Sequence, residues 1–155
     1  MKKIILLAFL PLLFFSCKED IHTTIPNSPV HLALDLRFED SKLNAKLSHA
    51  AFSEKRKASD KLGYGGILVI NGYGVNPVTL FAYDLACPIE VVRSVRVVPN
   101  DEGNCSCPKC GSVFDIANGN GVPISGPAAE SGYFLRSYLV APTGDNTYVV
   151  TNSYY

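Results

Sequence analysis

The sequence has no long basic segment, no phosphate-binding glycine motif and no internal repeat. Its longest run of lysine and arginine is Lys55-Arg56-Lys57, and the formal net charge of its 155 residues is zero. These absences argue against nucleic acid as a partner, because proteins that bind it gather positive charge on one face. Gly72-Tyr73-Gly74 is typical of a turn rather than of a ligand-binding loop.

No hydrophobic run is long enough to span a membrane as a helix, which takes about 20 apolar residues. The longest run, residues 4–15, follows two lysines and leads into Ser16-Cys17. This arrangement is typical of a secretory signal, and the position of the cysteine resembles a bacterial lipobox. We therefore predict a lipoprotein signal peptide over residues 1–17 and a lipid on Cys17 that anchors the protein in the bacterial cell envelope. The alternative is cleavage near Ser16 and secretion without a lipid.

The polar segment 18–29 is predicted to be a flexible tether, and residues 30–155 a single domain. Lys18-Glu19-Asp20 resembles the acidic retention or surface-export tags of Gram-negative lipoproteins. This resemblance favours the outer membrane or the cell surface as the location of the anchored domain.

Short apolar segments, separated by clusters of Gly, Pro, Asn and Asp, predict strands throughout the domain. The predicted strands cover residues 30–37, 67–70, 78–85, 91–98, 112–116, 133–140 and 148–151. Between residues 44 and 57 the signals conflict, since 44–48 can extend a hairpin and 47–57 can form a short helix. So many short strands with so little helix predict an all-β sandwich or small barrel.

Four cysteines remain after the predicted lipid takes Cys17: Cys87, Cys105, Cys107 and Cys110. In an exported protein such a set can form two disulfides. It can equally supply four thiolates to one metal site. The Cys-Pro-x-Cys-Gly run that begins at Cys107 resembles one knuckle of a zinc ribbon, but the chain lacks the second Cys-x-x-Cys knuckle that a ribbon needs.

The run from Cys107 to Asp115 reads Cys-Pro-Lys-Cys-Gly-Ser-Val-Phe-Asp. It resembles the second cluster-binding loop of Rieske iron–sulfur proteins, which reads Cys-Pro-x-His-Gly-Ser-x-Phe-Asp. Cys87-Pro88-Ile89 is placed like the first loop of that family, Cys-x-His, and Gly126-Pro127-Ala128 resembles the proline loop that covers the cluster. The resemblance extends over residues 86–140. It implies an all-β, Rieske-like antiparallel β-sandwich with the cluster-binding loops at one end, and a cofactor-covering role for Pro127.

The resemblance also implies ligands for a [2Fe–2S] cluster, with departures from the family. In Rieske proteins two cysteines hold one iron and two histidines hold the other. By position, Cys87 and Cys107 match the two cysteines, and Cys110 replaces one histidine with another possible ligand. Ile89 replaces the second histidine and cannot coordinate a metal. Cys105 is the candidate for the missing ligand, because side chains two residues apart on a strand share a face.

Other candidates for the missing ligand are weaker. Glu90 lies beside Ile89, but carboxylates are uncommon cluster ligands, and a solvated charge at a strand edge is the simpler role. His22, His31 and His49 all lie outside the two loops. Four thiolates would suit Zn²⁺ or an all-cysteine [2Fe–2S] cluster.

Two further positions bear on the reduction potential that the resemblance implies. Ser112 matches the serine whose hydroxyl donates to a bridging sulfide in high-potential members. Phe114 stands where those members have a tyrosine that donates to a cysteine sulfur. Thiolates in place of histidines and the loss of this donor both predict a low potential for any cluster, roughly −400 mV rather than the Rieske range of about −150 to +300 mV.

Three hypotheses for the function follow from these patterns. The first is a membrane-anchored Rieske-like protein that transfers electrons through an altered, low-potential [2Fe–2S] cluster, with a redox partner protein that the sequence does not identify. The second is a cluster-free binding or structural lipoprotein held by disulfides. The third is a domain with a structural four-thiolate zinc site. An electron carrier or a non-enzymatic lipoprotein is favoured over a catalyst, because the chain is too short to add the mononuclear-iron domain of an oxygenase.

Overall fold

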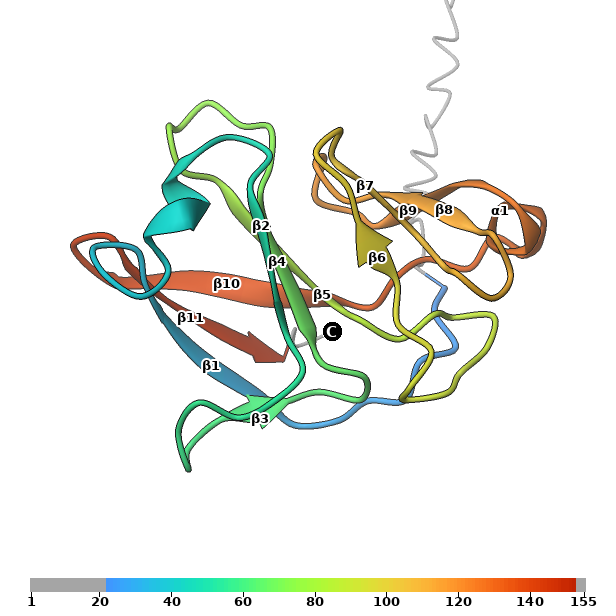
Figure 1. Ribbon diagram of the computed structural model, residues 1–155, viewed down its shortest axis with the longest axis horizontal. Coiled ribbons are helices and arrows are strands. Elements are labelled where there is room, and N and C mark those ends of the chain that lie inside the picture. Colours follow the sequence, from blue (N-terminus) through green and yellow to red (C-terminus); the bar gives the residue numbers. More distant parts are fainter. Residues whose placement is uncertain (1–21, 153–155) are drawn as a thin grey trace, which may run out of the picture.

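The computed structural model describes residues 22–152. The predicted signal peptide and the lipidation site Cys17 lie outside the described residues. The strands are antiparallel and form two sheets, which confirms the predicted all-β class (Figure 1). Among residues 22–152, no helix has the length and apolar character needed to cross a membrane.

The larger sheet has seven strands in the order β2-β4-β5-β10-β11-β1-β3 and curls around its own core (Figure 1). The strands are β1 (Val30–Asp35), β2 (His49–Phe52), β3 (Lys61–Leu62), β4 (Ile67–Asn71), β5 (Leu80–Asp84), β10 (Ser137–Gly144) and β11 (Thr147–Asn152). In β1 the predicted alternation is present, since Leu32 and Leu34 are buried between exposed neighbours. Alternation of this kind directs one face of a strand into the core.

The smaller sheet has four short strands in the order β6-β7-β8-β9. They are β6 (Val98–Pro99), β7 (Asn104–Ser106), β8 (Val113–Asp115) and β9 (Val122–Ser125). The helix α1 (Pro127–Ser131) follows β9 and lies at the same side of the molecule (Figure 1). A 3-10 turn, η1 (Ser41–Asn44), precedes β2 in the larger sheet.

Strand β4 forms a wall between two hydrophobic cores. Its alternate side chains divide between them: Ile67 and Val69 pack into the core of the larger sheet, whereas Leu68 and Ile70 pack into the core beneath the smaller sheet. All four are fully buried. A strand covered on both faces needs apolar residues at every position, which explains the uninterrupted run Ile-Leu-Val-Ile.

Most predicted strands are present with shifted ends. The predictions over 30–37, 78–85 and 112–116 contain β1, β5 and β8, and those over 67–70 and 148–151 lie within β4 and β11. The prediction over 133–140 is right only from Ser137 onward, and the conflicting region 44–57 contains β2 rather than a helix of that length.

The strand predicted over 91–98 is wrong for most of its length. Only Val98 belongs to a strand, β6. The Val91 N–H donates to the carbonyl of Cys87 at 2.9 Å, and the Val95 N–H donates to that of Val92 at 3.0 Å, so residues 91–95 fold into turns, and Arg96 forms only an isolated bridge with Ala86. The valines suggested a strand, but tertiary contacts determine their conformation here, because β-propensity depends strongly on context.

The predicted tether differs from the structure over residues 22–29. Ile25 is buried, and its carbonyl accepts a hydrogen bond from Arg136 Nε at 2.8 Å. The Phe134 N–H donates to the His22 carbonyl at 2.9 Å, and the Thr24 hydroxyl donates to the carbonyl of Pro88. This part of the chain is therefore attached to the domain, close to the loop that carries Cys87.

Candidate metal centre

A buried carboxylate fixes the start of the first cysteine loop, which comprises residues 87–91. Asp84, at the end of β5, is fully buried and accepts four hydrogen bonds. Its Oδ2 accepts from the Tyr138 hydroxyl at 2.6 Å and from the Tyr64 N–H at 2.7 Å. Its Oδ1 accepts from the Gly65 N–H at 2.9 Å and from the Ala86 N–H at 2.8 Å. The carboxylate thus holds the backbone immediately before Cys87 against the larger sheet.

The first cysteine loop closes on itself through its backbone. The Val91 N–H donates to the Cys87 carbonyl at 2.9 Å, and Val91 has a positive φ of 51°. This left-handed conformation is uncommon for a β-branched residue and costs about 1–3 kcal/mol. The N–H groups of Ile89 and Glu90 interact with the Cys87 sulfur. The loop therefore turns its backbone donors toward one thiol.

The second cysteine loop, residues 107–112, joins β7 to β8 and has the same backbone closure. The Gly111 N–H donates to the Cys107 carbonyl at 2.9 Å, and Gly111 has a φ of +73°. No atom crowds the position of a Cβ on Gly111, so the positive φ alone accounts for glycine here. The Cys107 N–H donates to the Ser112 carbonyl at 2.8 Å and completes the turn.

The segment around Gly126 packs directly on the second cysteine loop. A Cβ on Gly126 would lie 2.9 Å from the Cα of Ser112, so only glycine allows this approach. The Ala128 N–H donates to the Ser112 Oγ at 3.0 Å. Pro127 is exposed at the first turn of α1. Of the predicted cofactor-binding residues, Ser112 therefore lies at the site, and Pro127 lies in the segment that packs on the second cysteine loop, where its covering role stays a prediction.

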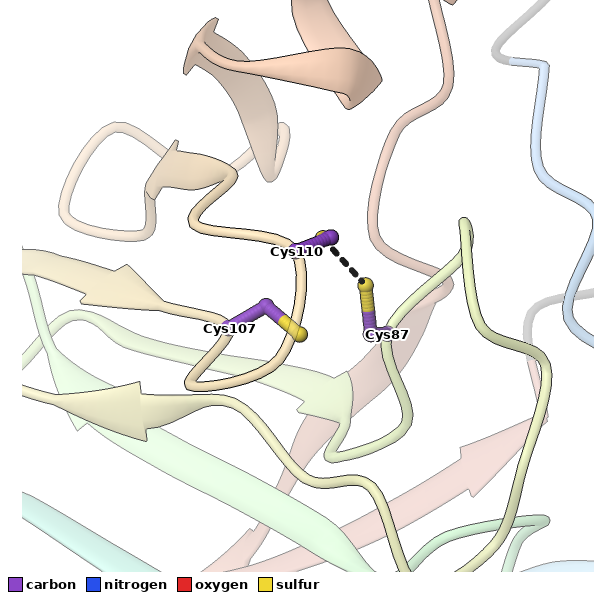
Figure 2. A group of neighbouring side chains, drawn as sticks. All are labelled: Cys87, Cys107 and Cys110. Carbon is purple, nitrogen blue, oxygen red and sulfur yellow. Dashed lines mark hydrogen bonds between the residues drawn. The ribbon is translucent and has the colours of Figure 1, made fainter.

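Three thiols from the two loops converge. The sulfur atoms of Cys87, Cys107 and Cys110 all lie within 4.8 Å of one another, and those of Cys87 and Cys110 are 3.6 Å apart. Figure 2 shows Cys107 and Cys110 on one loop facing Cys87 on the other. Cys87 and Cys107 are buried, whereas Cys110 is half-buried. Such a group can hold a metal ion, and the described cysteines form no disulfide.

The surroundings of Cys87 and Cys110 shift the pKa values of these two thiols in opposite directions. Burial raises the pKa of Cys87 to about 12, although the N–H groups of Glu90 and Ile89 partly oppose this shift. Burial also acts to raise the pKa of Cys110, but hydrogen bonds with Ser112 and the neighbouring thiols outweigh it and lower the pKa. The Cys110 sulfur lies 3.2 Å from Ser112 Oγ, whose hydroxyl can donate to a thiolate. Cys110 is therefore the thiol of this pair that ionises first.

Cys105 does not join the group of three sulfurs. It lies in β7, is buried and packs in the apolar core beneath the smaller sheet, where burial raises its pKa. The rule that places residues two apart on one face fails here because β7 ends at Ser106 and Cys107 belongs to the turn. The prediction of Cys105 as the missing ligand is therefore not supported by the geometry.

A charged pair that the sequence does not indicate lies at the site. Lys109 Nζ and Glu90 Oε2 form an ion pair at 2.5 Å that joins the tips of the two cysteine loops. The Glu90 side chain is only 13% exposed, so the solvated strand-edge role expected for it is wrong. Ile89 instead packs partly buried against the apolar core.

No protein-family model matches the chain, and no significant match is found among curated proteins or among solved structures. The resemblance to Rieske proteins therefore depends on the motifs alone. The site is defined by its own geometry, as a group of three thiols able to hold a metal ion.

Proposed function

We propose that this protein is an electron carrier of the bacterial cell envelope whose metal centre is held by Cys87, Cys107 and Cys110. One observation carries the proposal: three sulfur atoms, contributed by two separate loops, lie within 4.8 Å of one another. Thiolates are common ligands of zinc and of the iron in iron–sulfur sites. When iron is bound, it can gain and lose one electron.

The sulfur geometry favours a single metal ion over a two-iron cluster. Two thiolates bound at about 2.3 Å to one tetrahedral ion lie about 3.8 Å apart. The Cys87–Cys110 separation of 3.6 Å is close to this value. A Rieske arrangement would instead put Cys110 on a different iron from Cys87 and Cys107. We therefore propose a thiolate-held single ion in a domain that keeps the loop motifs of the Rieske family.

The surroundings of the sulfurs suit a redox centre. The N–H groups of Ile89 and Glu90 lie at the Cys87 sulfur, and Ser112 Oγ lies at the Cys110 sulfur. Hydrogen bonds to sulfur and the degree of solvent exposure tune the potential of such centres. Cys110 is half-buried, which gives a partner protein close access to the ion. Negatively charged thiolates stabilise the oxidised ion, so the potential should lie below that of a histidine-ligated centre.

A structural zinc site is a second candidate, favoured by a specific observation. The second cysteine loop bonds its own ends together, with Gly111 donating to Cys107 and Cys107 donating to Ser112. A filled d-shell ion such as Zn²⁺ would lock this turn to the first loop without redox chemistry.

Anaerobic purification followed by metal analysis and spectroscopy tests the proposal. We expect about one iron per chain, a visible absorption band that bleaches on reduction, and the paramagnetic resonance signal of isolated high-spin ferric iron. A signal that appears only on reduction and requires two irons per chain would replace the single ion with a [2Fe–2S] cluster. Stoichiometric zinc without iron would favour the structural site, and protein without metal that resists loading would refute the metal centre.

The lipid anchor forms a separate part of the proposal, because Cys17 lies outside the described residues. Changing Cys17 to alanine should move the protein from the membrane fraction to the soluble fraction or block its maturation. Processed protein that stays in the membrane after this change would contradict the anchor.

A further inference from the structure

The two cysteine loops share a closing backbone hydrogen bond and the conformation of their fifth residue. In each loop the N–H of the fifth residue donates to the carbonyl of the first at 2.9 Å, and the fifth residue has a positive φ. The loops read Cys-Pro-Ile-Glu-Val from Cys87 and Cys-Pro-Lys-Cys-Gly from Cys107. The fourth position is therefore Glu90 in the first loop and Cys110 in the second.

Because the two loops close at the same position, a fourth ligand is expected at a different residue from the one that the family pattern indicates. The family pattern Cys-x-His points to Ile89, two residues after Cys87. The structure gives the first loop the longer spacing of the second loop, so the counterpart of the ligand Cys110 is three residues after Cys87. That residue is a carboxylate, a group that binds both iron and zinc in proteins.

Glu90 lies outside the group of three sulfurs in this structure and is paired with Lys109 of the second cysteine loop. Its carboxylate is 2.5 Å from the ammonium of Lys109, the residue between Cys107 and Cys110 that directly precedes the latter. The ammonium thus lies against the carboxylate, on the loop that carries Cys107 and Cys110. The Lys109 side chain is 62% exposed, so water can solvate it when the carboxylate leaves.

We propose that Glu90 is the fourth ligand of the metal centre and that Lys109 holds the carboxylate when no metal is bound. This inference rests on the three-thiolate centre proposed above, and it does not depend on which metal the cell supplies. On binding, the carboxylate exchanges its ammonium partner for the ion, the thiols release their protons to solvent as they become thiolate ligands, and no electron is transferred.

Titration of the anaerobically purified full chain with Co²⁺ tests the assignment, because Co²⁺ reports both thiolate number and tetrahedral geometry in its absorption spectrum. E90Q should bind Co²⁺ at least about 10-fold more weakly than the unmodified protein, as expected for loss of a ligand or its equivalent support. E90C should bind with a thiolate-to-cobalt band about one-third more intense, since a fourth thiolate joins three. E102Q, a change of an exposed acid in the turn before β7, is the matched control and should match the unmodified protein.

K109M separates ligation from a purely structural ion pair. It removes the competing ammonium but keeps the carboxylate, so Co²⁺ affinity should be retained or raised. If E90Q binds as well as the unmodified protein, or if E90C adds no thiolate intensity, Glu90 is not a ligand. If E90Q and K109M lose affinity equally, the pair only ties the loops together. If the unmodified protein shows no thiolate-to-cobalt band at all, the three-thiolate centre itself is refuted.

Discussion

The two cores of this domain are built from different chemistry. The core of the larger sheet consists of aliphatic side chains with a few aromatic ones and contains no cysteine. The core beneath the smaller sheet contains Cys87, Cys105 and Cys107, with Cys110 packed against it. The strands differ as well, since β1 and β11 pair over five residues whereas β6 and β7 pair over two. The core of the larger sheet is thus stabilised by aliphatic burial, whereas the second core contains the thiols, which come from the loop after β5 of the larger sheet and from the smaller sheet.

This difference predicts that the two regions can be destabilised separately, except where they share structure. The shared wall is formed by β4 and by β5, whose Ala82 and Tyr83 face opposite cores. Asp84 at the end of β5 is the polar link between this wall and the first cysteine loop.

The largest effect is expected from Asp84→Ala, because it damages both regions at once. The change leaves the Tyr138 hydroxyl and three N–H groups buried without an acceptor. Each unsatisfied donor costs about 1–3 kcal/mol, so the free energy of unfolding should fall by about 4 kcal/mol or more. Denaturant unfolding measures this loss, and metal content should fall with it. Asp84→Asn keeps one acceptor oxygen and should lose about half as much. An unchanged free energy of unfolding in Asp84→Ala would show that the carboxylate does not stabilise the fold.

Leu32→Ala should destabilise the larger sheet and leave the thiol site intact. Leu32 is fully buried in the core that lacks cysteine. Loss of such a side chain costs about 2–5 kcal/mol through lost burial and the cavity left behind. Leu139→Ala is the matched control, because Leu139 is 48% exposed and its loss should cost less than about 0.5 kcal/mol. Metal stoichiometry in Leu32→Ala at low temperature should equal that of the unmodified protein, and a loss of metal there would show that the two cores are not separable.

Removal of the metal should lower stability by a smaller amount, and the effect should be confined to the smaller sheet and the two cysteine loops. A metal present at 100 times its dissociation constant stabilises the folded state by about 2.7 kcal/mol. Amide hydrogen exchange should become faster in β7 and β8, which flank the second cysteine loop, and in the first cysteine loop after chelation. The amides of β1 and β11 should remain protected. If chelation made amide exchange in β1 and β11 equally faster, the metal would stabilise both regions, and the two regions would not be separable.

The smallest expected effect is an order of reactivity among the thiols of the metal-free protein. The thiolate is the reactive form, so a lowered pKa makes a thiol react at lower pH. Iodoacetamide should modify Cys110 first, because its pKa is lowered and it is half-buried. Cys87 should react slowly up to high pH, because burial raises its pKa to about 12. The pKa of Cys87 is higher in the folded protein than its ordinary value of 9.0. The stability that this thiol contributes to the metal-free protein is therefore fully present below pH 9 and is lost as pH rises toward 12. Mass spectrometry of modified peptides gives the order, and faster modification of Cys87 than of Cys110 would reverse it.

The sequence allowed the fold class and most strands to be predicted because their signals are local. The alternation around Leu32 and the continuous apolar run at Ile67–Ile70 reflect burial on one face and on two faces. The segment 91–98 was mispredicted because the turn that contains Val91 depends on a hydrogen bond to Cys87, which its composition does not reveal.

The thiol group could be predicted only in part. The Cys-x-x-Cys spacing brings Cys107 and Cys110 together locally, and the family resemblance correctly indicated that Cys87 would join them. Cys105 was assigned by strand periodicity, which stops applying where β7 ends. The role proposed for Glu90 depends on a backbone equivalence between two loops and on an ion pair across them, and neither is encoded in any short motif.

The attachment of residues 22–25 to the domain limits where a partner protein can meet the metal centre. Thr24 bonds to Pro88, the neighbour of Cys87, so the N-terminal segment passes beside the first cysteine loop. Cys17 and His22 are five positions apart in the sequence, and a chain of that length reaches at most about 18 Å. With Cys17 lipidated as proposed, the centre cannot swing far into the surrounding compartment. Electrons would then be exchanged close to the lipid headgroups, with partners that are themselves held at the membrane surface.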